Sequence, residues 1–188
     1  MNYIEEITNT SIRKPNTMVA GISSKILQIR KENIKQSLSD LDNIEHRQDF
    51  VATVDGVMYY DDARAESVNA TWFTFENIVK PVIWIAGGND SDTDFKELKR
   101  VAKKKVKALI CIGSQGGNLR KSFQKDVKDI IEVDNIEEAV ATASLMAKEN
   151  DIVLFSPACK SDIEGETYLE RGKFYKDFVK QMENEHRQ

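Results

Sequence analysis

The chain has 188 residues and a mass of 21.4 kDa, enough for one well-buried domain with an attachment but not for two full domains. Hydrophobic residues make up 40% and charged residues 31% of the sequence, a balance typical of soluble globular proteins. The net charge of −4 and the pI near 5.4 argue against a general binder of nucleic acids or of acidic membrane surfaces.

The sequence also carries no sign of a membrane span, a secretion signal or a metal site. No apolar run is long enough to cross a bilayer, and the first ten residues lack a basic-then-apolar pattern. We therefore expect a cytoplasmic protein in which Cys111 and Cys159 are reduced and buried. The two histidines, His46 and His186, lie far from any Cys-x-x-Cys spacing, so a zinc site is not expected.

The N-terminal part of the chain predicts two short helices. Residues 1–15 are polar and weakly periodic, and helical spacing of apolar residues begins after Pro15. The pattern places one helix within residues 16–29 and a second within residues 32–41, with apolar residues along one stripe. That stripe consists of Met18, Ile22, Ile26, Ile29, Ile34 and Leu38.

From residue 49 onward, strand and helix signals alternate. Residues 49–54 and 57–60 flank Asp55-Gly56, a pair that suits a type I′ turn, and so predict a β-hairpin. Ser67 is a candidate N-cap for a helix that carries Trp72 and Phe75. The further expected strands are 81–86, 106–112, 127–133 and 151–156. The further expected helices are 94–102, 117–123, 135–150 and 173–182.

This alternation indicates an α/β fold with a mainly parallel sheet that is covered by helices on both faces. In such sheets, ligands bind beyond the carboxyl ends of the strands. The strands here lead into four loops at that edge, residues 61–67, 87–94, 113–117 and 156–165. Any chemical function is expected to come from these loops.

Known catalytic and phosphate-binding motifs are not found in them. A P-loop needs G-x-x-x-x-G-K-[ST], and the nearest approach, GETYLERGKF at residues 165–174, has the wrong spacing. Gly113, Gly116 and Gly117 are more simply turn glycines. Because both histidines lie in polar linker or terminal segments, a Ser-His-Asp or Cys-His arrangement is not expected.

Two charged stretches allow more than one interpretation. The sequence DDARAE at residues 61–66 places paired carboxylates beside Arg64, which fits either general acid–base chemistry or a salt-bridged surface turn. The lysine run at 103–105 is most simply a solvated helix end, where cations complement the helix dipole. Composition and spacing alone therefore lead to an α/β domain with an acidic loop face.

Three longer stretches resemble the Mur ligase family. Residues 16–71 are similar to the junction between the central and C-terminal domains of these enzymes, and residues 80–95 and 153–179 resemble strand-loop signatures of the C-terminal domain. Within the last stretch, SPAC followed by ERG and a helix is the most specific part. The resemblance extends from about residue 16 to about residue 182 and is closest to the branch that adds D-glutamate to a nucleotide-linked cell-wall precursor.

The resemblance implies a fold, a domain division and cofactors. Residues 1–43 would be the tail of a central ATPase domain, and residues 44–188 a Rossmann-like C-terminal domain that brings in the amino acid. The family enzymes use ATP and Mg²⁺, but the P-loop, the metal ligands and the sugar-nucleotide domain have no counterpart in this sequence. We therefore expect no cofactor and no catalytic residue in the isolated chain.

The resemblance also assigns site residues position by position. Arg47, in a retained His-Arg pair, and Asp62 would face the nucleotide. The amino-acid-facing positions are largely altered: Arg64 replaces a lysine, Glu66 a threonine and Ser91 a lysine, whereas Ser161 keeps the family serine. Gly165 stands where the family has an aromatic residue. An anionic amino acid needs charge-assisted partners, so these changes predict that D-glutamate binding is lost.

Two functions follow from this resemblance, and they differ in class. The first is a non-catalytic binding or regulatory module, retained for a protein partner, a nucleotide or another small molecule. The alternative is a C-terminal fragment or subunit of an ATP-dependent amino acid ligase that is active only with the missing domains. An unrelated Rossmann-type enzyme is a third, weaker possibility. The N-terminal stripe predicts contact with a second copy or another protein, unless these helices fold back on their own domain.

Overall fold

A computed structural model describes Gln28, residues 45–113 and residues 117–187. Contacts within the chain divide it into two units, residues 1–40 and residues 41–188, and the fold described below belongs to the second unit. The two helices expected within residues 16–41 lie outside the described residues, except for Gln28, which is helical. The interaction surface expected on those helices lies outside them as well.

The second unit is an α/β fold built on a six-stranded sheet. Its strands are β1 (Asp49–Val54), β2 (Val57–Asp61), β3 (Val82–Gly87), β4 (Val106–Ile112), β5 (Asp129–Val133) and β6 (Ile152–Phe155). Its helices are α3 (Val68–Asn77), α4 (Lys96–Lys105), α5 (Asn118–Phe123), α6 (Ile136–Met146) and α7 (Tyr168–His186). The strand order is β1-β2-β6-β3-β4-β5, and only the β1–β2 pair is antiparallel.

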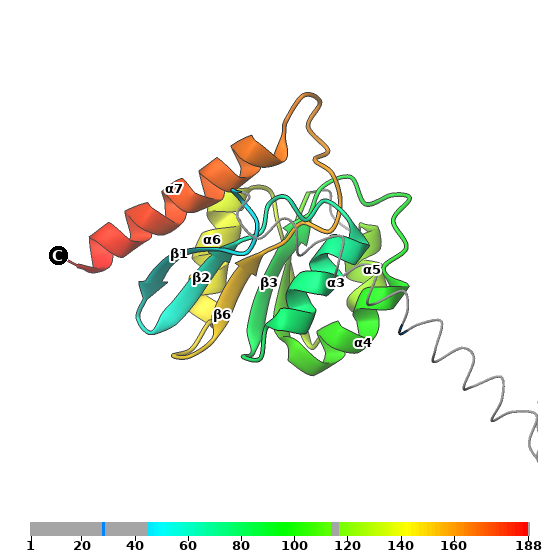
Figure 1. Cartoon of the computed structure of the whole chain (residues 1–188), viewed down its shortest axis with the longest axis horizontal. Helices are drawn as coiled ribbons and strands as arrows, with labels where there is room; N and C mark the ends of the chain where they lie inside the picture. Colours follow the sequence, from blue (N-terminus) through cyan, green and yellow to red (C-terminus); the bar gives the residue numbers. More distant parts are fainter. Residues whose placement is uncertain (1–27, 29–44, 114–116, 188) are drawn as a thin grey trace, which may run out of the picture. The chain divides into compact units, whose positions relative to one another are not determined.

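Helices cover both faces of this sheet, as the sequence predicts. Figure 1 shows α3 in front of the strands and α6 behind them; α4 packs beside α3, and α7 packs beside α6. Strand β3 is buried along its whole length, because helices pack on both of its faces. Ile83 and Ile85 belong to the core beneath α6 and α7, whereas Trp84 contacts Phe75 and Phe123 edge-to-face on the opposite side.

Local signals fix several of these elements. Asp55 and Gly56 have φ angles of 50° and 75°, which is the double left-handed turn that joins β1 to β2. The side chains of Ser67 and Asn135 accept hydrogen bonds from the backbone of the first turns of α3 and α6. The hairpin and the Ser67 cap are therefore confirmed as predicted.

The helix boundaries differ from the prediction in several places, and three of these differences have a local cause. Helix α4 begins at Lys96 and not at Asp94, whose carboxylate instead accepts a hydrogen bond from the Lys96 N–H. Helix α6 ends at Met146, and the following residues form a turn in which Asn150 has a φ of 72°. Helix α7 begins at Tyr168, five residues earlier than predicted, because a capping box with Thr167 opens it.

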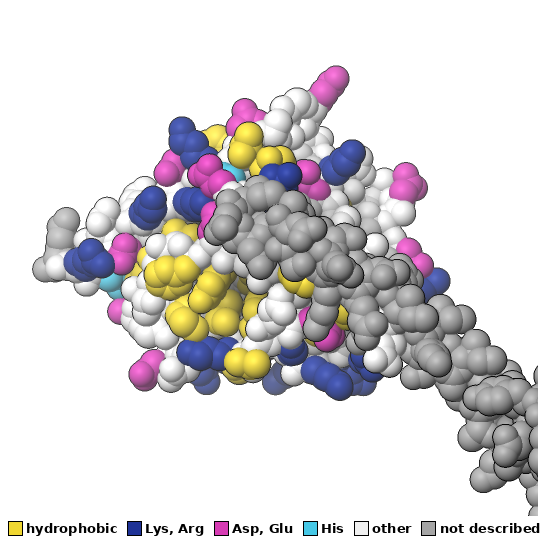
Figure 2. Space-filling model, viewed as in Figure 1, with side chains coloured by type: hydrophobic (Ala, Val, Ile, Leu, Met, Phe, Trp, Pro, Cys, Tyr) yellow, Lys and Arg dark blue, Asp and Glu magenta, His cyan; other side chains and the backbone are white. Residues whose placement is uncertain are grey.

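Among the described elements, one part of the sheet has less helical cover than the rest. On the face that carries α3, hydrophobic side chains gather over β2 and β6 (Figure 2). Met58, Tyr60, Ile152 and Leu154 line a groove of about 360 Å³ there. This groove lies away from the loops at the carboxyl ends of the strands, so we describe the candidate site separately.

Candidate functional site

The segment that leads into β1 presents Arg47 on a strained turn. His46 and Gln48, on either side of it, have φ angles of 63° and 51°, a conformation that costs a non-glycine residue about 1–2 kcal/mol. Two hydrogen bonds hold the turn: the His46 N–H donates to Asp49 Oδ2 at 2.7 Å, and the His46 carbonyl accepts from the Arg64 N–H at 3.1 Å. The surrounding structure therefore fixes where Arg47 lies.

His46 is buried, which corrects the prediction that it lies in a polar linker. Its side chain is hydrogen-bonded through Nδ1 to Oδ2 of Asp61, a residue that is fully buried. Lys176 of α7 places its Nζ 3.6 Å from the same oxygen and 2.8 Å from Asp49 Oδ2. Burial raises the pKa of Asp61, and the hydrogen bond from His46 and the charge of Lys176 oppose that rise. This cluster ties the turn before β1 to the end of β2 and to α7.

The next residue, Asp62, forms a second buried group. Its Oδ2 accepts hydrogen bonds from Thr74 Oγ1 at 2.6 Å and from Ser156 Oγ at 2.8 Å. Burial raises the pKa of Asp62 to about 7, although the two hydroxyls and the charge of Arg47 lower it. Asp61 and Asp62 are both fully buried, so the interpretation of this stretch as a salt-bridged surface turn is wrong.

Two polar atoms of this region are buried without a hydrogen-bond partner in the described part of the chain. They are Oδ1 of Asp62 and Nη2 of Arg47. The Arg47 guanidinium lies over the ring of Phe73, with its Cζ 5.7 Å from the ring centre. Buried groups of this kind are rare in folded proteins because an unmade hydrogen bond costs about 1–3 kcal/mol. A polar ligand that reached both atoms would remove that cost.

Arg64, on the same loop, already has a partner within the chain. Its Nη1 donates to the hydroxyl of Tyr168 at 3.1 Å, and its Cζ lies 5.1 Å from the centre of the Tyr168 ring. The sequence predicts that the aromatic wall is lost at Gly165. The structure supplies an aromatic ring three residues later, at the first position of α7. Glu66 follows in the loop and is half-buried.

The Gly-Gly turn after β3 lies against the loop that follows β6. Gly88 has a φ of 134°, and a Cβ at this position would lie 2.2 Å from the carbonyl oxygen of Lys160. The Asn89 N–H donates to that same oxygen at 2.9 Å. Ser91, two residues on, is exposed, and its hydroxyl donates to Asn89 Oδ1. Glycine at position 88 is therefore required for the close approach of the two loops.

The aspartates of this loop have a structural use that sequence reasoning missed. Asp90 Oδ2 accepts a hydrogen bond from the Leu119 N–H, in the first turn of α5, at 2.6 Å. Asp94 Oδ1 accepts one from the Lys96 N–H at the start of α4, at 3.1 Å. Carboxylates at helix N-termini are favourable because they bind free N–H groups and oppose the helix dipole. Two of the three aspartates therefore stabilise helix starts.

The retained serine of the family motif is also occupied from within. Ser161 Oγ donates to a carboxylate oxygen of Glu166, and it accepts a hydrogen bond from the Ile163 N–H at 3.1 Å. The loop between these residues contains Gly165, which has a φ of 82°. The carboxylate that Ser161 contacts is therefore that of Glu166, a residue of the same loop.

Arg171 fills the crevice between β3 and β6, where the strand order changes direction. Its Nη2 donates to the Gly87 carbonyl at 2.6 Å and its Nη1 to the Cys159 carbonyl at 3.4 Å. The guanidinium also lies over the ring of Phe155. Nothing in the local sequence around ERG indicates this role, because the partners are up to 84 positions away.

Other predicted groups have structural roles or lie outside the described residues. Cys111 and Cys159 are free and buried, as expected, and burial raises the pKa of both thiols to about 12, so they stay neutral. Lys105 is not simply solvated: its ammonium donates to two carbonyl oxygens, of Phe75 and Ile78, at the end of α3. Residues 114–116 of the glycine loop lie outside the described part, and no cluster within that part suits a metal ion.

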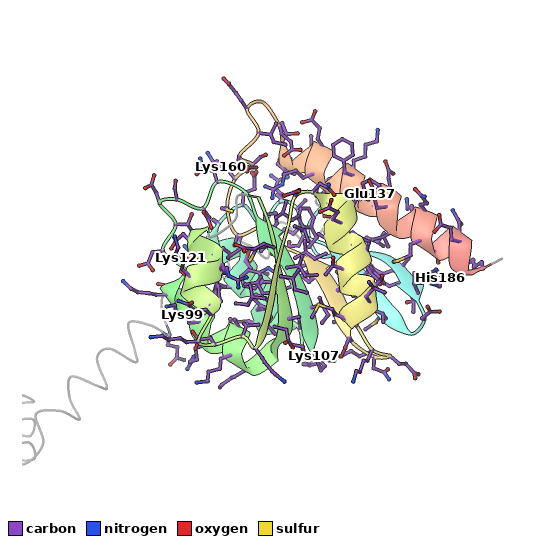
Figure 3. The ribbon with its side chains drawn as sticks, turned by 180° about the vertical axis from the view of Figure 1, so that it is seen from behind. Lys99, Lys107, Lys121, Glu137, Lys160 and His186 are labelled. Carbon is purple, nitrogen blue, oxygen red and sulfur yellow. The ribbon has the colours of Figure 1, made fainter. Side chains whose placement is uncertain are left out.

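The site residues thus fall into two groups at the carboxyl edge of the sheet. Arg47 and Asp62, which the resemblance predicts to face the nucleotide, lie together and keep unused hydrogen-bonding atoms. The positions that the resemblance predicts to face the amino acid are spread over three loops, where Arg64 contacts α7 and Ser161 contacts its own loop. Figure 3 shows Lys160 at this edge of the molecule and Lys107 at the opposite edge.

Comparison with known sequences gives a consistent picture. The family model of the Mur ligase glutamate ligase domain matches residues 46–159. The chain is 37% identical over 183 residues to the UDP-N-acetylmuramoylalanine–D-glutamate ligase of Chlorobium chlorochromatii, covering 95% of this chain and 39% of that protein. It is 32% identical over 167 residues to the ligase of the same name from Salinibacter ruber, covering 89% and 36%. The chain spans well under half the length of these relatives.

Solved structures share the fold at low sequence identity. A murein peptide ligase from Psychrobacter arcticus aligns over 74% of this chain and 30% of its own, with a TM-score of 0.53 and 10% identity. FolC of E. coli in complex with ADP aligns over 73% of this chain and 32% of its own, with a TM-score of 0.51 and 16% identity. These likenesses support the α/β fold and say nothing more specific.

Proposed function

Because the chain belongs to the Mur ligase family, whose glutamate ligase domain it matches, we propose that it is a non-catalytic binding module. On this proposal the domain descends from the D-glutamate-adding ligases, keeps the nucleotide-facing pair, and no longer binds D-glutamate as those enzymes do. The curated relatives carry the name of that activity, but the chain spans only 36 to 44% of their length.

One observation carries the proposal: three of the four amino-acid-facing positions, Arg64, Ser91 and Ser161, already have a hydrogen-bond partner within the chain. Ser161 is bonded to Glu166, and Arg64 is bonded to Tyr168. Ser91, in place of a lysine, offers no positive charge to a substrate carboxylate and is bonded to Asn89. A D-glutamate molecule would have to break these contacts while meeting the carboxylate of Glu166, so its binding would cost more than it returns.

At the nucleotide-facing pair, in contrast to the amino-acid-facing positions, we expect ligand binding to be kept. Nη2 of Arg47 is a buried donor without a partner among the described residues, and guanidinium groups bind phosphate oxygens well. Arg47 would therefore hold a phosphate of ATP, which in a ligase supplies the phosphoryl group that activates a carboxylate. Magnesium does not fit the described part of the chain, since no group of carboxylates, histidines or cysteines there could hold it.

The alternative function is a C-terminal part of an ATP-dependent amino acid ligase, completed by the domains that the relatives have. The preserved and unsatisfied pair of Arg47 and Asp62 favours it, because a nucleotide bound between domains would use both residues. In that case the new Glu66 and Asp92 would suit a neutral or basic amino acid better than D-glutamate.

A direct binding experiment tests the proposed loss of D-glutamate binding. Calorimetric titration of the purified chain with D-glutamate should give no heat of binding, whereas the triple variant Ser91→Lys, Glu66→Thr, Glu166→Gln should gain measurable affinity. A restored charge-assisted bond is expected to improve affinity by roughly 10- to 100-fold. Tight D-glutamate binding by the unmodified chain would refute the proposal.

A second experiment addresses catalysis. The chain is mixed with the P-loop-containing part of a relative, and ADP release is measured with a panel of amino acids and the muramoyl precursor. ADP release that depends on the chain and on an amino acid would establish the alternative. Absence of turnover, together with nucleotide binding that Arg47→Ala abolishes, supports the binding module.

We also propose a cytoplasmic location, which fits the cell-wall precursor chemistry named for the relatives. No helix among the described residues is both long enough and apolar enough to cross a membrane. Fractionation of the producing cells, with detection of the native chain, would test this location.

A further inference from the structure

A second hollow at the carboxyl edge adjoins the site described above and shares Ser161, Glu166 and Arg171 with it. It lies between the loop after β6, the first residues of α6 and the first half of α7, and encloses about 400 Å³. That volume lies within the range of small-molecule sites. Glu137, at the start of α6, marks its position in Figure 3. Arg64, Glu66 and Ser91 do not line it, and Ser161, which does, is bonded to Glu166.

The wall of this hollow is apolar. Ile112 lies at the end of β4, Ile136 at the start of α6, and Phe174 and Phe178 one turn apart on α7. Phe174 is 50% exposed, although a side chain of this size is usually well covered in a monomer. A ligand with an aromatic or branched aliphatic body would cover these side chains and remove their apolar surface from water.

The rim of the hollow carries negative charge. Four carboxylates line it, from Asp134 and Glu137 at the start of α6 and from Asp162 and Glu166 on the loop after β6. Among the lining residues, all of which the structure describes, the only cation is Arg171, which is 3% exposed and bonded to backbone carbonyls.

The N-terminus of α6 works in the opposite direction. It favours an anion, but its first-turn N–H is already bonded to the side chain of Asn135, and Glu137 and Glu138 oppose its dipole. One helix dipole amounts to about half a charge, so the four carboxylates outweigh the dipole and the single arginine. The potential in the hollow is therefore negative.

From the volume, the apolar wall and this charge, we propose that the hollow binds a small organic cation. The ligand would be a primary amine carried on an aromatic or branched aliphatic group. Its body would lie against Phe174 and Phe178, and its ammonium would face Glu137 and Asp162 across the mouth. The ring of Phe174 adds a cation–π contribution if the ammonium lies over its face. The inference uses neither the nucleotide positions nor Arg64, Glu66 or Ser91, and it shares only Ser161 and Glu166 with the residues on which the proposed function rests.

The test uses three probes that share one ring and differ in charge. 2-Phenylethylamine, 2-phenylethanol and phenylacetate are titrated into the ¹⁵N-labelled chain, and backbone amide shifts are followed by NMR. The amine is expected to bind with a dissociation constant on the order of 1 mM, as for a ligand of about nine heavy atoms. It should shift the amides of residues 134–137, 161–163 and 174–178. The alcohol should bind more weakly, and phenylacetate should not bind measurably.

Matched variants separate specific binding from a general effect of charge. Glu137→Gln and Asp162→Asn should each weaken amine binding roughly two- to fivefold, the range for a single exposed ion pair. Glu164→Gln, on the same loop but not lining the hollow, should leave the affinity unchanged. Phe174→Ala should weaken both the amine and the alcohol, which separates the contribution of the wall from that of the rim.

Two results would overturn the inference. One is phenylacetate binding as well as the amine. The other is equal weakening by Glu164→Gln and Glu137→Gln, which would mean that the amine responds only to net charge. Since D-glutamate and ATP are absent from this experiment, its failure would not bear on the proposed function, and the reverse is also true.

Discussion

Gly172 in α7 offers a sharp test of the buried histidine cluster. Replacing a glycine inside a helix by alanine ordinarily stabilises a protein by about 1 kcal/mol. At this position, however, the added Cβ would lie 2.0 Å from Nδ1 of His46 and 2.7 Å from its Cε1 and Cγ. The ring has little room to move, because it is 3% exposed and bonded to the buried carboxylate of Asp61.

The size of the effect follows from what the ring must give up. To admit the methyl group, His46 must leave Asp61, and a buried charge that loses its partner costs about 3–5 kcal/mol. Lys176, 3.6 Å from the same oxygen, keeps part of the interaction. After subtracting the gain in helix propensity, we expect Gly172→Ala to lower the free energy of unfolding by about 2–4 kcal/mol.

The assay is urea unfolding followed by tryptophan fluorescence, in two backgrounds. In the wild-type background Gly172→Ala should be destabilising. In a His46→Ala background, where the clashing ring atoms are gone, the same substitution should be neutral or should stabilise by up to about 1 kcal/mol. Stabilisation in both backgrounds, or equal destabilisation in both, would refute the reasoning.

Three further predictions concern charge and association. Burial raises the pKa of Asp62 to about 7 in the folded chain from an ordinary value of 3.8. The folded state then binds the proton more tightly than the unfolded state, so the free energy of unfolding should fall as the pH rises from about 4 to about 7. In urea unfolding, Asp62→Asn should flatten that fall. Lys105→Met removes the donor to the end of α3 and should cost about 1–3 kcal/mol in the same assay, whereas Lys104→Met on the same helix should change stability by less than about 0.5 kcal/mol. The apolar stripe within residues 16–41 should bring two chains together, so light scattering should give a mass above 21.4 kDa; a monomer at every concentration would contradict this.

The elements that sequence reasoning predicted well depend on short-range signals. The Asp55-Gly56 turn and the Ser67 cap act within four residues of themselves, and the strands are apolar runs that a parallel sheet buries from both sides. The start of α7 has an equally local signal, the capping box of Thr167 and Glu170, which the helical spacing of apolar residues does not reveal.

The features that escaped prediction depend on distant partners. His46 looks like a linker residue until Asp61, fifteen positions away, and Gly172 of α7 enclose it. The role of Arg171 depends on the Gly87 carbonyl, 84 positions away. The family resemblance predicts that Arg47 and Asp62 both face the nucleotide. Only the folded chain shows that each has a buried polar atom without a hydrogen-bond partner among the described residues.

The acidic Gly-Gly loop stabilises the starts of two helices and also sets the charge presented to a ligand. Different residues serve these two roles. Asp90 and Asp94 bind N–H groups at the starts of α5 and α4, so losing either carboxylate would leave one of these N–H groups without its partner. Ser91 and Asp92 lie between them, and both are exposed. Exposed substitutions of this kind usually change stability by less than about 0.5 kcal/mol. The charge that this loop presents to a ligand can therefore change at positions 91 and 92 while the hydrogen bonds of Asp90 and Asp94 stay in place, and loss of the family lysine need not have weakened the fold.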